Sequence, residues 1–340
     1  MESFLLAVVE VAPETVAFWS MTGLIALGTL TMLEIVLGID GDLGGVPEPE
    51  IPGNLQKHVR IIRPGRVGLL KLRRLMLADA KGQYVLWMND DAYPHAGLLD
   101  AHFRSHQEGI GPRVVAGRAI WKPIEKPNMF DRIVQRSDMV FFIQPEHRSA
   151  VDYRNCFGLN MSFPRSLAMK IGGVADVDEH YGYEDIELAW RMVRAGAGCI
   201  YEPEAVVTHD HRYTPIDVHR REYLLGRAAY AFAHANPEFA IELFKFNLRE
   251  CTTLDQFSAS ICLAWRDSIR IERTFLELTQ CPVDAVADGM LPIFAEHWVL
   301  LKRLLWRWGV LDASRGIDSR WSILSQTSPD QVLNPPLIPV

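Results

Sequence analysis

The chain has 340 residues, of which 49% are hydrophobic and 23% are charged, an ordinary composition for a soluble globular protein. Its formal net charge of −7 argues against nucleic acid as a partner, and the surface as a whole should not attract anionic membrane lipid. A phosphate-bearing ligand would therefore have to be held locally, by a metal ion or by a few basic side chains.

The cysteines and the first residues bear on the compartment. An odd number of cysteines without any Cys-x-x-Cys pair is typical of a reducing compartment, and it argues against a disulfide framework and a zinc ribbon. The first residues lack the basic region of a secretory signal. We therefore expect a cytoplasmic protein, with peripheral membrane association left open. The five cysteines are Cys156, Cys199, Cys251, Cys262 and Cys281.

One uncharged stretch, residues 16–33, has about the minimum length of 18 apolar residues for a membrane span. It contains Ser, Thr and Gly residues, and no basic residue flanks it closely. A buried helix that runs into a buried strand explains the pattern equally well, and we favour this second interpretation.

Strands and helices alternate along the first two hundred residues. Buried strands that alternate with helices predict an α/β fold with a largely parallel sheet, in which ligands bind beyond the carboxyl ends of the strands. Residues 41–53 are rich in Gly and Pro and read as a loop. The pattern predicts strands at 5–11, 34–39, 58–62, 84–88, 114–121 and 199–208, and helices that open at Pro13 or span 69–80 and 182–196.

From about Pro215 the pattern becomes helical. We expect three parts: a domain at 1–214, a helical region at 215–313 and an irregular tail at 314–340. Helices are predicted at 217–235, 237–248, 254–279 and 292–308.

Acidic residues follow two of the predicted strands. Asp40 and Asp42 come after the second strand, and Asn89, Asp90 and Asp91 come after the fourth. Adjacent carboxylates repel each other unless a cation lies between them. Mg²⁺ and Mn²⁺ prefer such oxygen ligands and can bridge substrate phosphates. A solvated turn is the alternative explanation.

Two further motifs have both a structural and a functional explanation. Glu184 and Asp185 begin a predicted helix, where capping and the helix dipole alone favour acids, or where a carboxylate can serve as general base. His209 and His211 follow a predicted strand, either as surface residues or as ligands that complete a metal site.

Together these motifs resemble a known family. The sequence Gly-Leu-Asn-Met-Ser-Phe-Pro-Arg stands at 158–165, Ile-Gly-Gly at 171–173 and Tyr-Gly-Tyr-Glu-Asp-Ile-Glu-Leu at 181–188, ahead of Arg191 and His209. This run resembles the family 2 inverting glycosyltransferases with the GT-A fold, and especially the segment that they share with the galactosyltransferase C-terminal domain. The resemblance covers roughly residues 3–212 and is weaker before residue 80.

The resemblance implies a Rossmann-like GT-A fold, a mixed sheet flanked by helices and followed by the helical region. This helical region would cover the acceptor side or form an oligomer surface. It implies transfer of a sugar, with inversion, from a nucleotide-sugar donor, UDP-linked in the first instance, to an acceptor hydroxyl. The implied cofactor is Mn²⁺ or Mg²⁺. The acceptor could be a glycan, a lipid-linked sugar, a small metabolite or a peptide, because the fold does not choose among them.

The resemblance also implies roles for single residues. Asp185 matches the catalytic base, and Glu184 would contact the sugar or acceptor. Asp91 and His209 match the metal ligands, with His211 as a further candidate. At the nucleotide and the donor sugar the implied residues are Asp40 or Asp42, Arg73, Asp90, Asn160, Gly172 and Gly173.

The chain departs from the family at several positions. Asn89 replaces the first carboxylate of the Asp-x-Asp motif. The Asp-Asp-Gly-Ser motif is reduced to Ile-Asp-Gly-Asp at 39–42, so the base-contacting residue stays open between Asp40 and Asp42. These departures leave open a donor other than a UDP-sugar.

Two alternatives to a transferase remain. A sugar nucleotidyltransferase would also use an α/β sheet, a metal and acids, but residues 8–17 lack its Gly-rich basic loop. A catalytically silent binding protein on the same fold is the other alternative, and Asn89 keeps it open.

Overall fold

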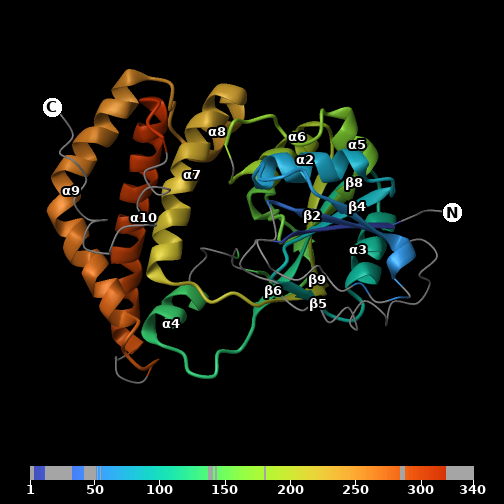
Figure 1. The fold of residues 1–340 in the computed structure, drawn as a ribbon, viewed down its shortest axis with the longest axis horizontal. Coiled ribbons are helices and arrows are strands. Elements are labelled where there is room, and N and C mark those ends of the chain that lie inside the picture. The colour runs from blue at the N-terminus through green and yellow to red at the C-terminus, as the bar shows by residue number, and fades with distance from the viewer. Residues whose placement is uncertain are drawn as a thin grey trace. The chain divides into compact units, whose positions relative to one another are not determined.

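The computed structural model describes residues 4–11, 33–41, 51, 53, 55–136, 141, 144–179, 181–283 and 288–318 (Figure 1). The chain divides into two compact units. The first comprises residues 1–123 and 138–211, and the second comprises residues 124–137 and 212–340.

Within the described residues, the first unit is built on a nine-stranded mixed sheet. Its order is β3-β2-β1-β4-β8-β6-β9-β5, with β7 paired to β9. Pairing is parallel from β3 to β4 and between β6 and β9, whereas β8, β5 and β7 pair antiparallel to their neighbours. The strands are β1 (Phe4–Val11), β2 (Leu33–Ile39), β3 (Val59–Ile62), β4 (Tyr84–Met88), β5 (Ala92–Pro94), β6 (Arg113–Trp121), β7 (Ser149–Ala150), β8 (Asn160–Pro164) and β9 (Gly198–His209).

The six predicted strands are confirmed, and so is the mixed sheet that the resemblance implies. The expectation of a largely parallel sheet is wrong for the short strands. The sequence of β8, Asn-Met-Ser-Phe-Pro, carries no run of β-branched residues, and β5 and β7 are only three and two residues long. The predicted helix at Pro13, the stretch 16–32 and most of the loop at 41–53 lie outside the described residues.

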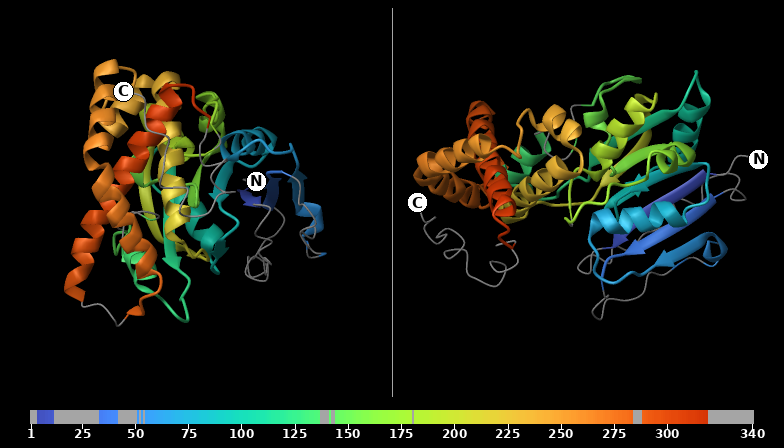
Figure 2. Two further views of the ribbon diagram at one scale, coloured as in Figure 1. Left: turned by 60° about the vertical axis from the view of Figure 1, so that its left-hand side comes forward. Right: turned by 90° about the horizontal axis from the view of Figure 1, so that it is seen from above.

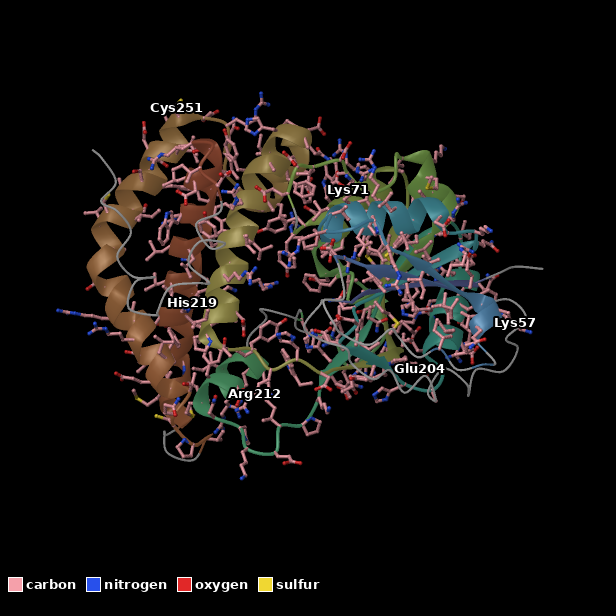
Figure 3. All side chains as sticks on the ribbon, viewed as in Figure 1. Lys57, Lys71, Glu204, Arg212, His219 and Cys251 are labelled. Atoms are coloured by element: carbon pink, nitrogen blue, oxygen red, sulfur yellow. The ribbon has the colours of Figure 1, made fainter. Side chains whose placement is uncertain are left out.

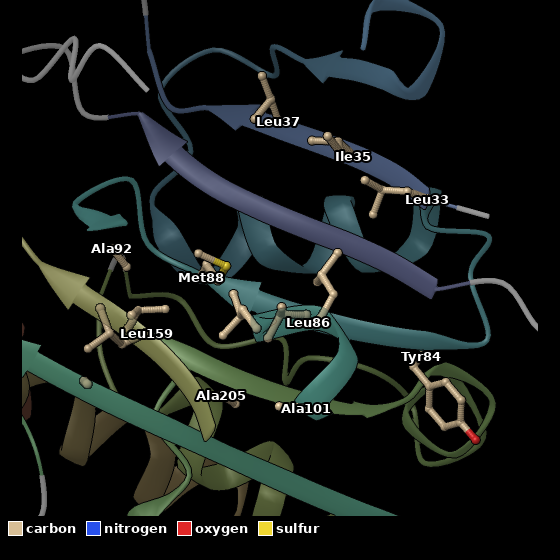
Figure 4. Close-up of a cluster of buried hydrophobic side chains, with 14 of the residues drawn as sticks. Leu33, Ile35, Leu37, Tyr84, Leu86, Met88, Ala92, Ala101, Leu159 and Ala205 are labelled. Atoms are coloured by element: carbon tan, nitrogen blue, oxygen red, sulfur yellow. The ribbon is translucent and has the colours of Figure 1, made fainter. Parts of the chain in front are cut away.

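The two faces of the sheet follow from strand periodicity. Alternate residues of β2 and β4 point into one core cluster, namely Leu33, Ile35 and Leu37 with Tyr84, Leu86 and Met88 (Figure 4). Gly38 belongs to the opposite set and faces α2 (Leu69–Asp79). A Cβ at Gly38 would lie 2.4 Å from the sulfur of Met76, so the glycine permits the close approach of this helix. The other helices of this unit are α3 (Leu98–Gln107), α5 (Arg165–Lys170) and α6 (Glu184–Arg194).

Strand pairing brings the acidic loop to the end of β9. The register of β5 with β9 places Ala92 opposite His209. Next to this pair, the amide of Asp210 donates to the carbonyl of Asp91 at 2.7 Å. The segment that follows β4 is therefore fixed beside the histidines that end β9.

The described part of the second unit is helical. The helices α7, α9 and α10 lie side by side (Figures 1 and 2). Arg212, labelled in Figure 3, donates to both carboxylate oxygens of the buried Asp131 at 3.0 and 2.8 Å. No helix in the described residues is both long enough and apolar enough to cross a membrane. The helices are α4 (Met129–Arg136), α7 (Pro215–Ala235), α8 (Pro237–Phe244), α9 (Cys251–Leu278) and α10 (Leu291–Ser314).

The four helices predicted after Pro215 are confirmed, with shifted ends. The second helix ends at Phe244 rather than at residue 248, because Lys245 adopts a left-handed conformation with φ of 63°. The last helix continues to Ser314 instead of ending at residue 308. Residues 319–340, most of the predicted tail, lie outside the described residues.

Two glycines allow α7 and α10 to touch backbone to backbone. A Cβ on Gly226 would lie 1.9 Å from the carbonyl oxygen of Trp306, and one on Gly309 would lie 2.0 Å from that of Tyr223. We expect Gly226→Ala to lower the free energy of unfolding by about 3 kcal/mol, because backbone atoms cannot yield as a flexible side chain can. Urea unfolding measures this change.

Gly289 supplies the matched control, because a Cβ there would meet nothing within 4 Å. Gly289→Ala should change stability by less than about 0.5 kcal/mol. A Gly226→Ala protein at least as stable as the wild type would show that the two helices do not cross this closely.

Candidate functional site

Asp91, His209 and His211 meet at the carboxyl ends of β4 and β9. The Oδ2 atom of Asp91 lies 3.3 Å from Nε2 of His209 and 3.3 Å from Nδ1 of His211. His209 is buried, and its ring packs edge-on against Trp121 and Phe141. The structure thus brings together the three residues predicted from the sequence as metal ligands.

The electrostatics of Asp91 favour the ionised carboxylate. Burial raises the pKa of Asp91, but the hydrogen bonds and charge of His209 and His211 outweigh burial and hold the pKa well below its usual range. The Oδ1 atom is buried and has no hydrogen-bond partner among the described residues. A buried acceptor without a partner is costly, and a cation would satisfy it.

The trio can be tested for fit to a divalent ion. Adjacent ligands of an octahedral ion with bonds of about 2.1 Å are about 3 Å apart, close to the two distances of 3.3 Å. Within the described residues, however, no group of three or more His, Cys, Asp or Glu side chains is already arranged around a cation position. The carboxylate suits Mn²⁺ or Mg²⁺, whereas the two imidazoles suit a transition metal better than Mg²⁺, so the set fits Mn²⁺ better; its side chains would have to turn toward the ion.

A second cluster centres on Arg73 of α2. The guanidinium of this buried residue donates to Glu184, to Oδ1 of Asn89 at 2.9 Å and to the carbonyl of Gly158 at 3.3 Å. The guanidinium carbon, Cζ, lies 4.9 Å from the centre of the Trp87 ring. Asn89, which replaces a carboxylate in the family motif, therefore pairs with an arginine rather than with the candidate metal ligands.

Glu184 and Asp185 begin α6 and differ in exposure. The Glu184 side chain is 2% exposed, and burial raises its pKa to about 7 against the lowering effect of Arg73. The Asp185 side chain is 16% exposed. Its Oδ2 accepts from the amide of Gly158 at 2.7 Å, and its Oδ1 accepts from Ile186 at 2.8 Å. Asp185 is thus the more exposed of the two carboxylates.

The backbone before α6 is unusual. Tyr183, which precedes Glu184, has φ of 64°, and Gly182 has φ of 110°. A left-handed conformation is uncommon for a residue with a side chain and points to a local functional constraint. This turn fixes the direction in which the first carboxylates of α6 project.

The acidic residues predicted to bind the nucleotide do not form one cluster in the described residues. Both oxygens of Asp40 accept from the backbone at the start of α2, with Oδ1 2.6 Å from the amide of Val67 and 3.0 Å from that of Gly68. Asp90 lies in the turn between β4 and β5, and Asp42 lies outside the described residues. Asp40 therefore fixes the entry to α2 in this structure.

Asn160 is buried and fully engaged by protein groups. Its amide nitrogen donates to the carbonyls of Arg118 at 3.1 Å and Ala205 at 2.9 Å, and its oxygen accepts from His102 at 2.8 Å. Through these hydrogen bonds Asn160, which lies on β8, joins strands β6 and β9.

Gly172 and Gly173 form the turn after α5, with φ of 95° and 70°. Arg191 donates to the carbonyls of Ile171 at 2.7 Å and Gly173 at 2.6 Å, and Glu187 pairs with the same guanidinium. The turn is therefore held firmly, and only residues without a side chain adopt its conformation readily.

Comparison with known proteins gives the family context. A family model described as the N-terminal domain of galactosyltransferase matches residues 140–215, the segment in which the sequence resembles the galactosyltransferase C-terminal domain. The pre-mycofactocin glycosyltransferases of two Mycobacterium tuberculosis strains, CDC 1551 / Oshkosh and ATCC 25618 / H37Rv, are each 27% identical over 214 residues. The match covers 62% of this chain and 44% of theirs, so the chain spans less than half the length of these relatives.

Solved structures decide the fold. The mannosyltransferase PcManGT from Pyrobaculum calidifontis, in complex with GDP-Man and Mn²⁺, matches with a TM-score of 0.55 at 13% identity, over 92% of this chain and 88% of that chain. The chain has the GT-A glycosyltransferase fold. The predicted resemblance and fold class are confirmed. TarS 1–349 of S. aureus also matches, at 13% identity with a TM-score of 0.46, over 92% of this chain and 91% of that chain.

The GT-A unit also contains a chain of buried, hydrogen-bonded polar side chains that was not predicted from the sequence. His106 donates to the hydroxyl of Ser162, this hydroxyl donates to His102, and His102 donates to Asn160, each at 2.8 Å. The tautomers follow from the fixed acceptor role of the Asn160 oxygen. The spacing of His102 and His106 on one helical face was the available signal.

This buried chain predicts how stability depends on pH. Burial lowers the pKa of His102 to about 4 and that of His106 to about 3, so these imidazoles gain protons only on unfolding as the pH falls below about 6.5. Glu184 acts oppositely, because its raised pKa makes the folded state bind the extra proton between about pH 4.5 and 7. We expect the two histidines to outweigh it, so stability falls between pH 6.5 and 5.

Urea unfolding between pH 5 and 7 measures this dependence. Glu184→Gln removes the opposing contribution, so its stability should fall more steeply with acidification than that of the wild type, whatever the absolute loss from breaking the Arg73 pair. A wild type whose stability rises on acidification would contradict the assignment of neutral buried histidines.

Proposed function

We propose that this chain is a metal-dependent glycosyltransferase that moves a sugar from a nucleotide-sugar donor to an acceptor hydroxyl with inversion. The observation that carries the proposal is the convergence of Asp91, which follows β4, on His209 and His211. In the same loop, Asn89 accepts from Arg73, which also donates to Glu184 at the start of α6. One short loop, residues 89–91, thus connects candidate metal ligands with the candidate base.

In this proposal Asp91, His209 and His211 hold a divalent cation. Such an ion supplies neutralisation of the negative charge that develops on the leaving nucleoside diphosphate. The pKa of Asp91 favours the deprotonated form that a ligand needs. The ligands of PcManGT, GDP-Man and Mn²⁺, support a donor and metal of this general class.

Asp185 would accept the proton of the acceptor hydroxyl as the hydroxyl oxygen attacks the anomeric carbon of the donor sugar. A single displacement of this kind inverts the configuration at that carbon. Of the two carboxylates at the start of α6, Asp185 is the more exposed, and hydrogen bonds from Gly158 and Ile186 fix its orientation. Glu184 is buried against Arg73, so a direct contact with sugar remains a prediction from the resemblance.

The test is a screen of UDP-, GDP- and dTDP-sugars by thermal shift and donor hydrolysis, with and without Mn²⁺. We expect one nucleotide class, UDP in the first instance, to raise the melting temperature and to be hydrolysed only when Mn²⁺ is present. The absence of any nucleotide response, with and without metal, would reject the proposal in favour of a silent binding protein on the same fold.

A further inference from the structure

The contacts of Arg73 form a closed ring through the start of α6. Arg73 donates to the carbonyl of Gly158 at 3.3 Å, and the amide of Gly158 donates to Asp185 at 2.7 Å. Glu184, the neighbour of Asp185, accepts from Arg73. The position of the Asp185 carboxylate therefore depends on Gly158, whose carbonyl oxygen accepts from Arg73.

The same guanidinium also holds the loop that follows β4. Its Nη2 atom donates to Oδ1 of Asn89 at 2.9 Å, two residues before Asp91. Beneath it, the ring of Trp87 lies 4.9 Å away and comes from β4 itself. Arg73 thus joins three separate segments, namely the loop at 89–91, the turn at 158–159 and the start of α6.

Arg73 is poorly placed to bind a ligand. It is 6% exposed, and its terminal nitrogens already donate to Glu184, Asn89 and Gly158. A phosphate could take over these donors only by leaving a buried carboxylate without its partner, which is strongly unfavourable. The family resemblance implies that Arg73 lies near the nucleotide, whereas in this structure its guanidinium is engaged by protein groups.

From these contacts we infer that Arg73 is a positioning residue that sets the Asp185 carboxylate and the Asn89–Asp91 loop in one fixed geometry for the chemical step. The inference rests on the proposed function. The chain uses Asn at position 89, and a carboxylate there would add a third negative charge beside the one guanidinium that already faces Glu184 and Asp185. Asn89, which replaces the first carboxylate of the family motif, therefore binds Arg73 without adding a negative charge.

Arg73→Lys is the decisive variant, because lysine keeps the charge but not the planar fork that reaches several acceptors at once. We expect kcat to fall about 10²-fold, the scale for small misplacement of catalytic groups, while the donor KM stays within about threefold. Peptides that cover residues 153–160 should exchange their amide hydrogens faster. Arg74→Lys is the matched control, since Arg74 is 45% exposed and pairs with the exposed Asp176.

Gly158→Ala tests the same ring with Arg73 intact. A Cβ at Gly158 would lie 2.2 Å from Nη1 of Arg73, so the guanidinium or the turn must shift while every charge is retained. We expect kcat to fall with donor KM unchanged, as in Arg73→Lys. This variant keeps the inference testable if Arg73→Lys does not fold, which its melting curve shows.

The outcomes separate this inference from the proposed function. A raised donor KM with unchanged kcat in Arg73→Lys would overturn the inference in favour of nucleotide binding. Unchanged kcat and unchanged exchange at 153–160 would overturn it as well. If the wild type turns over no donor, the proposed function fails, but hydrogen exchange still decides: exchange as slow in Arg73→Lys as in Arg74→Lys would overturn the inference.

Discussion

Replacing Asp185 by Asn should lower the turnover by about 10²–10⁴-fold while donor binding stays intact. The amide keeps the size of the side chain but cannot accept the proton of the acceptor hydroxyl. The hydrogen bonds from Gly158 and Ile186 end on the two carboxylate oxygens, so Asn can retain only one of them in the same geometry. Steady-state rates and calorimetric titration of the donor measure the two quantities separately.

Asp176→Asn is the matched control for this variant. Asp176 is 85% exposed and pairs only with the exposed Arg74 among the interactions described, so its loss should leave turnover unchanged. An Asp185→Asn enzyme with wild-type turnover would remove Asp185 from the mechanism. Loss of donor binding in the same variant would assign Asp185 to the donor site instead.

Replacing Asp91 by Ala should remove the dependence on divalent metal together with activity. The carboxylate faces both His209 and His211, and its Oδ1 is a buried acceptor that a cation would satisfy. We expect the affinity for Mn²⁺ to fall by more than about 100-fold, because loss of a supporting partner alone costs up to that much. Titration with Mn²⁺ in the presence of a nucleoside diphosphate measures the change.

The neighbouring Asp210 provides the control for Asp91. Its carboxylate pairs with Lys122 at 2.5 Å and is not one of the candidate ligands. Asp210→Asn should bind Mn²⁺ with wild-type affinity. If Asp91→Ala binds Mn²⁺ as well as Asp210→Asn does, the metal site lies elsewhere.

The sequence predicts the strands of the GT-A unit well where their residues are buried and contiguous. All five residues of β4 are buried, and its bounds match the predicted strand. The sequence could not predict which strands are neighbours, because a period of two residues describes the faces of a strand and not its partners. The insertion of the antiparallel β8 between β4 and β6 is an example.

The candidate site, too, could be predicted from the sequence only in part. Asp91, His209 and His211 were predicted together from motifs, and the pairing of β5 with β9 explains why they meet. Contacts inside the protein were not predictable, since Asn160 occurs in a site motif, yet its amide is engaged by Arg118, Ala205 and His102. Arg73 is similar, because burial on α2 gives no signal of what its guanidinium holds.

Calorimetric titration of the nucleoside diphosphate selected by the donor screen, with and without Mn²⁺, tests the central claim most directly. The claim is that the acidic loop after β4 and the histidines at the end of β9 form a metal-dependent nucleotide-sugar site. The account predicts binding that requires Mn²⁺ in the wild type and disappears in Asp91→Ala. Equal binding with and without Mn²⁺, or binding that survives in Asp91→Ala, would contradict it.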